Sequence, residues 1–279
     1  MYQFDRTEPV TLSLRASAGT VEIHAGPHES VQVEVVPLGD DPAAAQAAEN
    51  TRVALDGDTL IVAAPASDRR FWRRTPALRI TVRLPEGSSV AGDSASAEVR
   101  TSGLFRHVHL TLASASARIS DLLGDLRLSS ASGDLSAGRV GGSAQLKSAS
   151  GRVDVADVTG DVMVGTASGD VVIASGAGSL DASTASGRIT VGSLVTGRAR
   201  VRTASGDVAV GVAPGTGVWL DLNTVSGRTV TDLASHSDTA PPSAGLEVRV
   251  RTVSGNIHVH RATAADRGAT NMTSSDVIA

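Results

Sequence analysis

The sequence predicts an all-β fold, a single-stranded parallel β-helix, or β-solenoid, built from rungs of about 18 residues. A Ser/Thr-Ala-Ser-Gly motif occurs five times between Ser130 and Val210, and its glycines lie 18, 18, 18 and 19 residues apart. Each copy is too short for two strands joined by a crossover helix, so the copies can bury their apolar side chains only by stacking. The motif glycines are Gly133, Gly151, Gly169, Gly187 and Gly206.

Each copy contains two short runs in which apolar and polar residues alternate. Around Gly169, for example, the pairs Val162/Val164 and Val171/Ile173 are apolar. Because successive side chains of a strand point to opposite faces, each run predicts a strand with one buried face. A rung is therefore two strands and two turns.

The same pattern extends on both sides of the clear motif, around Gly227 and Gly255 and, more weakly, around Ala97 and Ala117. We expect nine rungs, stacked in chain order from Ala97 to Gly255, and one isolated rung around Gly19. The general preference of parallel crossovers predicts a right-handed coil. Since alanine replaces glycine in the first two rungs, we expect the glycine column to provide room more than positive φ.

The position after the motif glycine alternates between acidic and basic residues. Stacking would place opposite charges about 4.8 Å apart, and a slip by one rung would bring like charges together. We expect this charge ladder to set the alignment of the rungs more than their stability, because an exposed ion pair contributes only about 0.2–1 kcal/mol. Its members are Glu98, Arg118, Asp134, Arg152, Asp170, Arg188, Asp207 and Arg228, followed by Asn256.

The chain divides into three predicted parts: an irregular N-terminal β cap over residues 1–89, the repeat domain over residues 90–260, and a disordered tail over residues 261–279. The cap contains the isolated rung, a short Ala-rich helix that begins after Asp41, and a hairpin that turns at Gly57. A strand over Leu78–Leu84 follows. A cap is expected because an uncovered first rung would expose an unpaired strand edge. Residues 234–245 are expected to form a surface loop.

Composition narrows the function classes. The net charge of −4, with both signs interspersed, gives no general attraction for nucleic acid or an anionic membrane, and the absence of cysteine excludes disulfides and thiolate metal sites. No apolar run is long enough to span a bilayer, and the first ten residues lack the features of a signal peptide. We expect a cytoplasmic protein without a cofactor, associated with the envelope only through a partner.

A family resemblance rests on the order of several segments. GTVEI at 19–23 precedes the Ala-rich helix, followed by GDTLIV at 57–62, FWRR at 71–74, LRITVRLPEGSSV at 78–90 and the serial TASGDV-type rungs. This order resembles the bacterial toast-rack domains of unknown function, a family also called putative adhesin, over about residues 10–260. The resemblance implies a β-solenoid with an adhesin-like role, no established enzymatic activity and a link to envelope stress in some relatives.

One candidate interaction site is a basic aromatic loop that contains Arg69, Arg70, Phe71, Trp72, Arg73 and Arg74. Guanidinium groups and rings could hold phosphate, nucleic acid or another anionic surface. The alternative, which we favour, is that the two rings cover the end of the core while the arginines remain solvated.

Other candidates favour structural roles. His107/His109 and His258/His260 are pairs on outward positions, too far apart in the stack to share a metal ion, and we interpret them as surface histidines. The repeated serines lack a neighbouring histidine, and the nucleophile-elbow, Walker and Rossmann patterns are absent. Charged neighbours also argue against an ice-binding hydroxyl array.

The function expected from these observations is a non-enzymatic scaffold or protein-interaction module. Its partner would be a protein, either a second copy or another chain, so a homo-oligomer is one option, and nucleic acid is not favoured. Two alternatives stay open. A carbohydrate-binding β-helix is disfavoured by the presence of only two tryptophans. Binding of nucleic acid or another anionic polymer through the Arg69–Arg74 loop would show steep salt dependence.

Overall fold

The computed structural model describes residues 1–65, 75–233 and 245–263, which form two compact units, Met1–Val140 and Gly141–Ala279. The predicted β-solenoid is confirmed, since rung strands pair in parallel within both units and α1 (Pro42–Glu49) is the one α-helix of the described residues. The right hand of the coil and the division at residues 89 and 90 stay predictions. The expected tail lies almost entirely outside the described residues.

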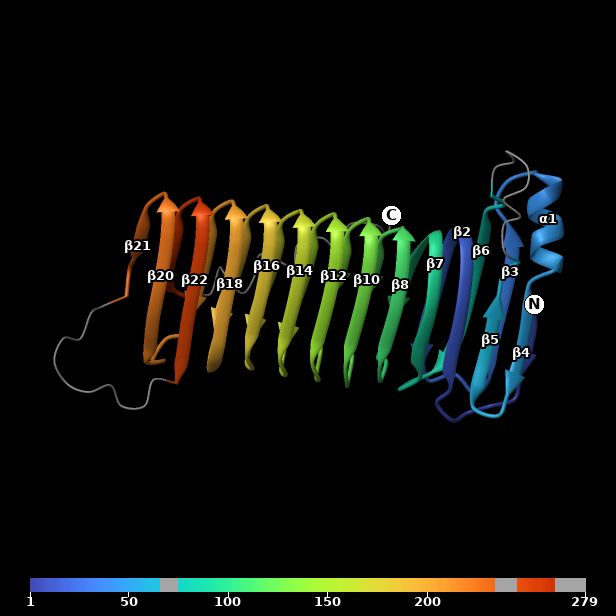
Figure 1. The fold of residues 1–279 in the computed structure, drawn as a ribbon. Coiled ribbons are helices and arrows are strands. Elements are labelled where there is room, and N and C mark those ends of the chain that lie inside the picture. The colour runs from blue at the N-terminus through green and yellow to red at the C-terminus, as the bar shows by residue number, and fades with distance from the viewer. Residues whose placement is uncertain (66–74, 234–244, 264–279) are drawn as a thin grey trace, which may run out of the picture. The chain divides into compact units, whose positions relative to one another are not determined.

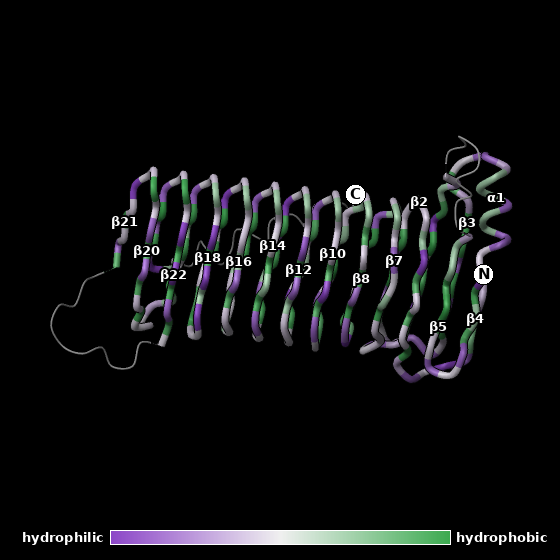
Figure 2. The backbone as a smooth tube through the Cα atoms, viewed as in Figure 1, coloured by the Kyte–Doolittle hydropathy of each residue, from purple (hydrophilic) through white to green (hydrophobic). Residues whose placement is uncertain are grey.

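In the C-terminal unit, residues 18 or 19 positions apart lie side by side. Ser150 pairs with Ser168, and Ser186 pairs with Ser205. The inward side chains of these strands are buried, as their alternating apolar pattern predicts. Figure 2 shows the changes of hydropathy along the backbone of the strands. The first strands of the rungs are β12 (Ala144–Ser150), β14 (Val162–Ser168), β16 (Leu180–Ser186) and β18 (Gly197–Ser205). The second strands are β13 (Val153–Val158), β15 (Val171–Gly176), β17 (Ile189–Leu194) and β19 (Val208–Val212).

The last two rungs do not stack in chain order, and our prediction was wrong here. The final rung consists of β22 (Leu246–Ser254) and β23 (Ile257–Arg261), which pair directly with β18 and β19. The preceding rung, β20 (Val218–Ser226) and β21 (Thr229–Thr231), pairs with the far side of β22 and β23. The last rung is thus inserted before the one that precedes it (Figure 1).

The inward side chains of the two rungs explain this order. Ile257 and Val259 are both 0% exposed, whereas Thr229 and Thr231, which occupy the same register positions, are exposed. Burying a large aliphatic side chain contributes about 1.5–3 kcal/mol, and threonine hydroxyls lose little by staying in water. The apolar rung therefore takes the covered position.

In the N-terminal unit, β2 (Thr11–Gly26) pairs along most of its length with β7 (Ser89–Ser102), and Gly19 lies beside Ala97. Our expectation of an isolated rung around Gly19 was therefore wrong. The other edge of β2 pairs with β5 (Thr59–Ala63) and β6 (Leu78–Pro85), which together form one further rung.

Antiparallel strands cover this rung. β3 (Val31–Pro37) pairs antiparallel with β6, and β4 (Arg52–Asp56) pairs antiparallel with β5 in the predicted hairpin. β1 (Tyr2–Phe4) adds to β3. Helix α1 begins after Asp41, whose carboxylate accepts a hydrogen bond from the Ala43 N–H at 2.9 Å. β3 and β4 thus pair the strand edges that an open first rung would expose.

The register of the remaining rungs corrects one alignment. β8 (Val108–Ser114) and β9 (Ala117–Ile119) precede β10 (Leu126–Ser132) and β11 (Leu135–Ala137), and Leu135 pairs with Ala117. Gly133 consequently lies against Ala115, so Ala115 and not Ala117 occupies the glycine column.

Candidate functional site

The corrected register changes the membership of the charge ladder. Arg118 pairs with Arg100 on one side and with Ser136 on the other, so it is not next to Glu98 or Asp134. Ser116 occupies the column instead, and its hydroxyl accepts a hydrogen bond from the Asp134 N–H at 3.1 Å.

The inserted rung changes the other end of the ladder. Asp207 has Asn256 as its neighbour, and Arg228 lies beyond Asn256. The predicted step from Asp207 to Arg228 is therefore wrong.

The acidic members mainly bind backbone of the adjacent rung. An Asp170 carboxylate oxygen accepts a hydrogen bond from the Arg188 N–H at 2.8 Å, and Asp207 does the same for the Asn256 N–H at 2.8 Å. Between side chains, Arg188 and Asp207 are 4.0 Å apart, while Glu98 and Arg152 form ion pairs within their own rungs. That the column sets the alignment of the rungs stays a prediction.

The other sequence-predicted sites do not converge. The loop Arg69–Arg74 lies outside the described residues. The His258 ring pairs with the Asp232 carboxylate at 2.8 Å, and His107 accepts a hydrogen bond from the Asp125 N–H at 3.0 Å. No cluster of three or more histidine, cysteine, aspartate or glutamate residues suited to a metal ion occurs in the described part of the chain.

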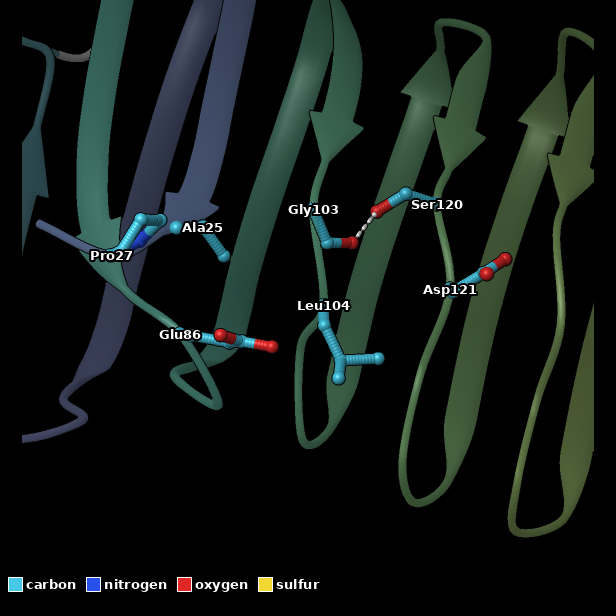
Figure 3. A pocket seen from close by; sticks show the side chains of 8 residues that line it. Ala25, Pro27, Glu86, Gly103, Leu104, Ser120 and Asp121 are labelled. Atoms are coloured by element: carbon cyan, nitrogen blue, oxygen red, sulfur yellow. Dashed lines mark hydrogen bonds between the residues drawn. The ribbon is translucent and has the colours of Figure 1, made fainter.

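A cavity of about 640 Å³ lies at the turns of the N-terminal unit, and its lining includes Glu86, Gly103, Ser120 and Asp121 (Figure 3). The Ser120 hydroxyl donates to the Gly103 carbonyl at 2.7 Å, and an Asp121 carboxylate oxygen accepts a hydrogen bond from the Arg139 N–H at 2.9 Å. These bonds join neighbouring turns. The two carboxylates belong to separate turns, so the cavity gives no sign of paired acid and base groups.

The end rung of the C-terminal unit, formed by β20 and β21, has an open edge. Among the described strands, β20 pairs with β22 alone, so its other edge has no partner. Three large side chains of this rung are exposed: Trp219 at 46%, Val225 at 78% and Val230 at 41%. The sequence did indicate that this rung lies at an end, because Thr229 and Thr231 occupy positions that are apolar in other rungs.

Comparisons with solved structures return proteins of low sequence identity. A "putative adhesin" from Bacteroides fragilis is 14% identical, with 92% of this chain and 95% of that chain covered and a TM-score of 0.46. A "putative adhesin" from Parabacteroides distasonis is 9% identical, with coverage of 92% and 95% and a TM-score of 0.38. A "putative cell adhesion protein" from Clostridium sporogenes is 11% identical, with coverage of 91% and 93% and a TM-score of 0.26.

The search of curated proteins found no match. Within the described residues, no helix combines the length and apolarity needed to cross a bilayer. The family model for the Toastrack domain DUF4097 matches residues 10–278, and the solenoid of stacked TASGDV-type rungs is the structure that the resemblance implied. This chain therefore belongs to the Toastrack DUF4097 family.

Proposed function

We propose that the chain is a non-enzymatic interaction module whose stacked rungs serve as a rigid scaffold. The open edge of β20 would receive a β-strand from a second protein chain. The observation that carries this proposal is the outer edge of the end rung, which has no partner strand among the described residues, in a chain whose family is classed as a domain of unknown function.

The composition of β20 supports strand addition. Exposed sheet edges are normally protected by lysine, proline, bulges or short strand length, because free N–H and C=O groups bind other strands. β20 is nine residues long and contains no lysine, no proline and only one charged residue, Asp221. The first rung of the N-terminal unit is covered by antiparallel strands instead. The β20 edge therefore suits a strand from a partner.

The inner face of the end rung supplies an apolar contribution. Leu220 and Leu222 point inward but are only half-buried, unlike Val248 and Val250 beside them, which are 0% exposed. A partner strand with matching aliphatic residues would complete their burial. Main-chain hydrogen bonds would provide affinity, and these side chains would provide selectivity.

The proposal is tested by light scattering after size exclusion over a range of concentrations, combined with site-specific cross-linking. A photo-reactive residue at Val225 should cross-link a second copy or an identified partner, whereas one at the exposed Leu123 of the N-terminal unit should not. The variant Leu222→Lys, which places a charge on the open inner face, should abolish the association. The control Met163→Lys, at an exposed outward position of β14 away from this edge, should preserve it.

Two results would overturn the proposal. One is a monomer at every concentration that turns over a polysaccharide. The other is an association that Leu222→Lys leaves intact and that cross-links equally from Leu123. Carbohydrate binding and nucleic-acid binding through Arg69–Arg74 have no observation in their favour and stay predictions.

A further inference from the structure

Four arginines form two like-charged rows on the outer face of β18 and β22. The register pairs Arg200 with Arg249 and Arg202 with Arg251. Neighbouring strands lie about 4.8 Å apart, and residues two positions apart on a strand are separated by about 7 Å. The arginine face, as we call these four residues, is thus a compact rectangle of positive charge.

The internal packing of the solenoid does not account for the arginine face. Like charges directly opposite each other on a sheet destabilise the pairing. Asp221 of β20 lies in the same row as Arg200 and Arg249, so stacking in chain order would have placed it beside Arg200. The insertion of β22 replaces this opposite-charge pair by a like-charge pair. Burial of Ile257 and Val259 explains the order of the rungs. It does not explain why residues 249 and 251 are arginines.

The neighbouring carboxylates neutralise only part of the arginine face. Arg249 forms ion pairs with Asp221 at 2.9 Å and with Glu247 at 3.2 Å, and Arg202 lies 3.9 Å from Asp181. Arg200 and Arg251 have no ion pair among the described residues. The row of Arg202 and Arg251 is flanked by the uncharged side chains of Ser183 and Asn223.

Glu247 is the main competitor for a ligand at this face. Arg198 donates a hydrogen bond to its carboxylate at 2.7 Å, and this bond, with the charges of Arg198, Arg249 and Arg200, lowers the pKa of Glu247 below its ordinary value. At neutral pH the carboxylate is therefore ionised and holds Arg198 and Arg249. Removing its charge would release both guanidinium groups.

The four arginines, with Val201, line a cavity of about 200 Å³. We propose that this arginine face binds a compact ligand with two adjacent phosphate groups, a diphosphate. Each guanidinium can bind phosphate oxygens through two N–H groups in a fixed geometry, and adjacent arginines match adjacent phosphates.

The surroundings favour this compact ligand over larger anions. Asp181, Asp221 and Glu247 border the face, and they would repel a long polyanion or an anionic membrane surface that extends past it. A single-stranded nucleic acid would need aromatic side chains on which bases stack. The Trp219 ring centroid lies 5.8 Å from the Arg249 guanidinium, and Trp219 does not line the cavity.

Calorimetric titration of the full chain with inorganic pyrophosphate tests the proposal. Arg251→Gln and Arg200→Gln should each weaken pyrophosphate binding by about tenfold or more, since each removes charged hydrogen bonds. Glu247→Gln should strengthen binding about threefold to tenfold, because it removes a competing charge. A gain of affinity cannot arise from a misfolded variant. Arg127→Gln, on an outward position of β10 in the N-terminal unit, is the matched control and should bind as the unmodified chain does.

Three results would overturn the proposal. The first is the absence of pyrophosphate binding at low salt, and the second is binding that Arg251→Gln and Arg127→Gln change equally. The third is affinity that orthophosphate matches, or that rises steadily with the length of polyphosphate or DNA, which would indicate unspecific attraction of anions. An ADP titration separates a diphosphate carried by a larger molecule from the free ion. Binding of either one to the arginine face supports the proposal.

Discussion

The motif glycine meets two requirements at once. Gly169 adopts a φ of +149°, a conformation that residues with a Cβ rarely adopt, and a Cβ at this position would lie 2.0 Å from the Gly151 carbonyl oxygen. Because alanine occupies this position in the first rungs, we expected that lack of space for a side chain would be the main reason for glycine here. The structure shows that room and positive φ both restrict this position.

We predict that Gly169→Ala destabilises the chain by about 2–4 kcal/mol, because it adds backbone strain and forces adjacent turns apart. The matched control is Gly165→Ala in the same rung, where the nearest atom to an added Cβ is the flexible Ser183 hydroxyl at 3.6 Å. That control should change stability by less than about 1 kcal/mol. Urea unfolding followed by circular dichroism measures both changes, and equal effects would contradict the assignment.

The column after the glycine is predicted to act by hydrogen bonding more than by charge. Asp170→Asn should be nearly neutral, since an amide oxygen can still accept the Arg188 N–H, as Asn256 does for the Arg228 N–H at 3.0 Å. Asp170→Ala should cost about 1 kcal/mol through the lost hydrogen bond. Urea unfolding at low and high salt compares the two variants. A charge ladder would instead make both substitutions equally harmful, with an effect that salt removes.

Single residues also explain an error of alignment. In the segment Ser114–Arg118, small residues alternate, and the two candidate zero positions, Ala115 and Ala117, differ by two. A shift by two keeps every side chain on the same face of a strand, so the apolar pattern fits both alignments. Only the pairing of Leu135 with Ala117 decides between them.

At the level of elements, the strands of the repeats could be predicted from periodicity, but the order of the last two rungs could not. Periodicity defines which face of a strand is buried. The order in which rungs stack depends instead on which rung loses more free energy of burial when it lies at an end. Thr229 and Thr231 carried this information, yet the insertion also requires a long connection between β21 and β22. The sequence shows that connection only as a polar stretch near residue 240.

The role of the inserted rung is tested at one register position. Ile257→Ala should destabilise the chain by about 2–4 kcal/mol, because it leaves a cavity in a fully buried position. Thr229→Ala, at the paired position in the exposed rung, should change stability by less than about 0.5 kcal/mol. Thermal and urea unfolding measure both. Similar losses would show that the two rungs are equally covered in solution.

Across the molecule, stability in each stack should depend on how many neighbours a rung has. Strand β18 pairs on both edges, while β20 has a partner on one edge among the described strands. Hydrogen exchange read by mass spectrometry should therefore show amides of β20 and β21 exchanging at least about tenfold faster than those of β16 and β18. Uniform protection along the C-terminal unit would contradict an open end.

The solenoid could be predicted from the sequence because the repeat shows the same apolar pattern many times. Five copies of one motif predict the rung, the buried face and the stacking. The short helix could be predicted from Asp41, and the β4–β5 hairpin could be predicted from the turn at Gly57. The arginine face was not accessible in this way. Arg200 and Arg249 are 49 positions apart in the sequence, and they become neighbours only through the changed order of the rungs.

The inserted rung also constrains how the chain is made. During synthesis from the N-terminus, β20 leaves the ribosome before β22, when the edge of β18 is still vacant. At that stage β20 can pair with β18, which places Asp221 beside Arg200. This temporary pairing is favourable, and it delays the pairing of β22 with β18. The finished order therefore requires that this early docking be undone, or that the edge of β18 stay vacant until β22 and β23 have been synthesised, so emergence of β22 and β23 is the event that completes this part of the stack.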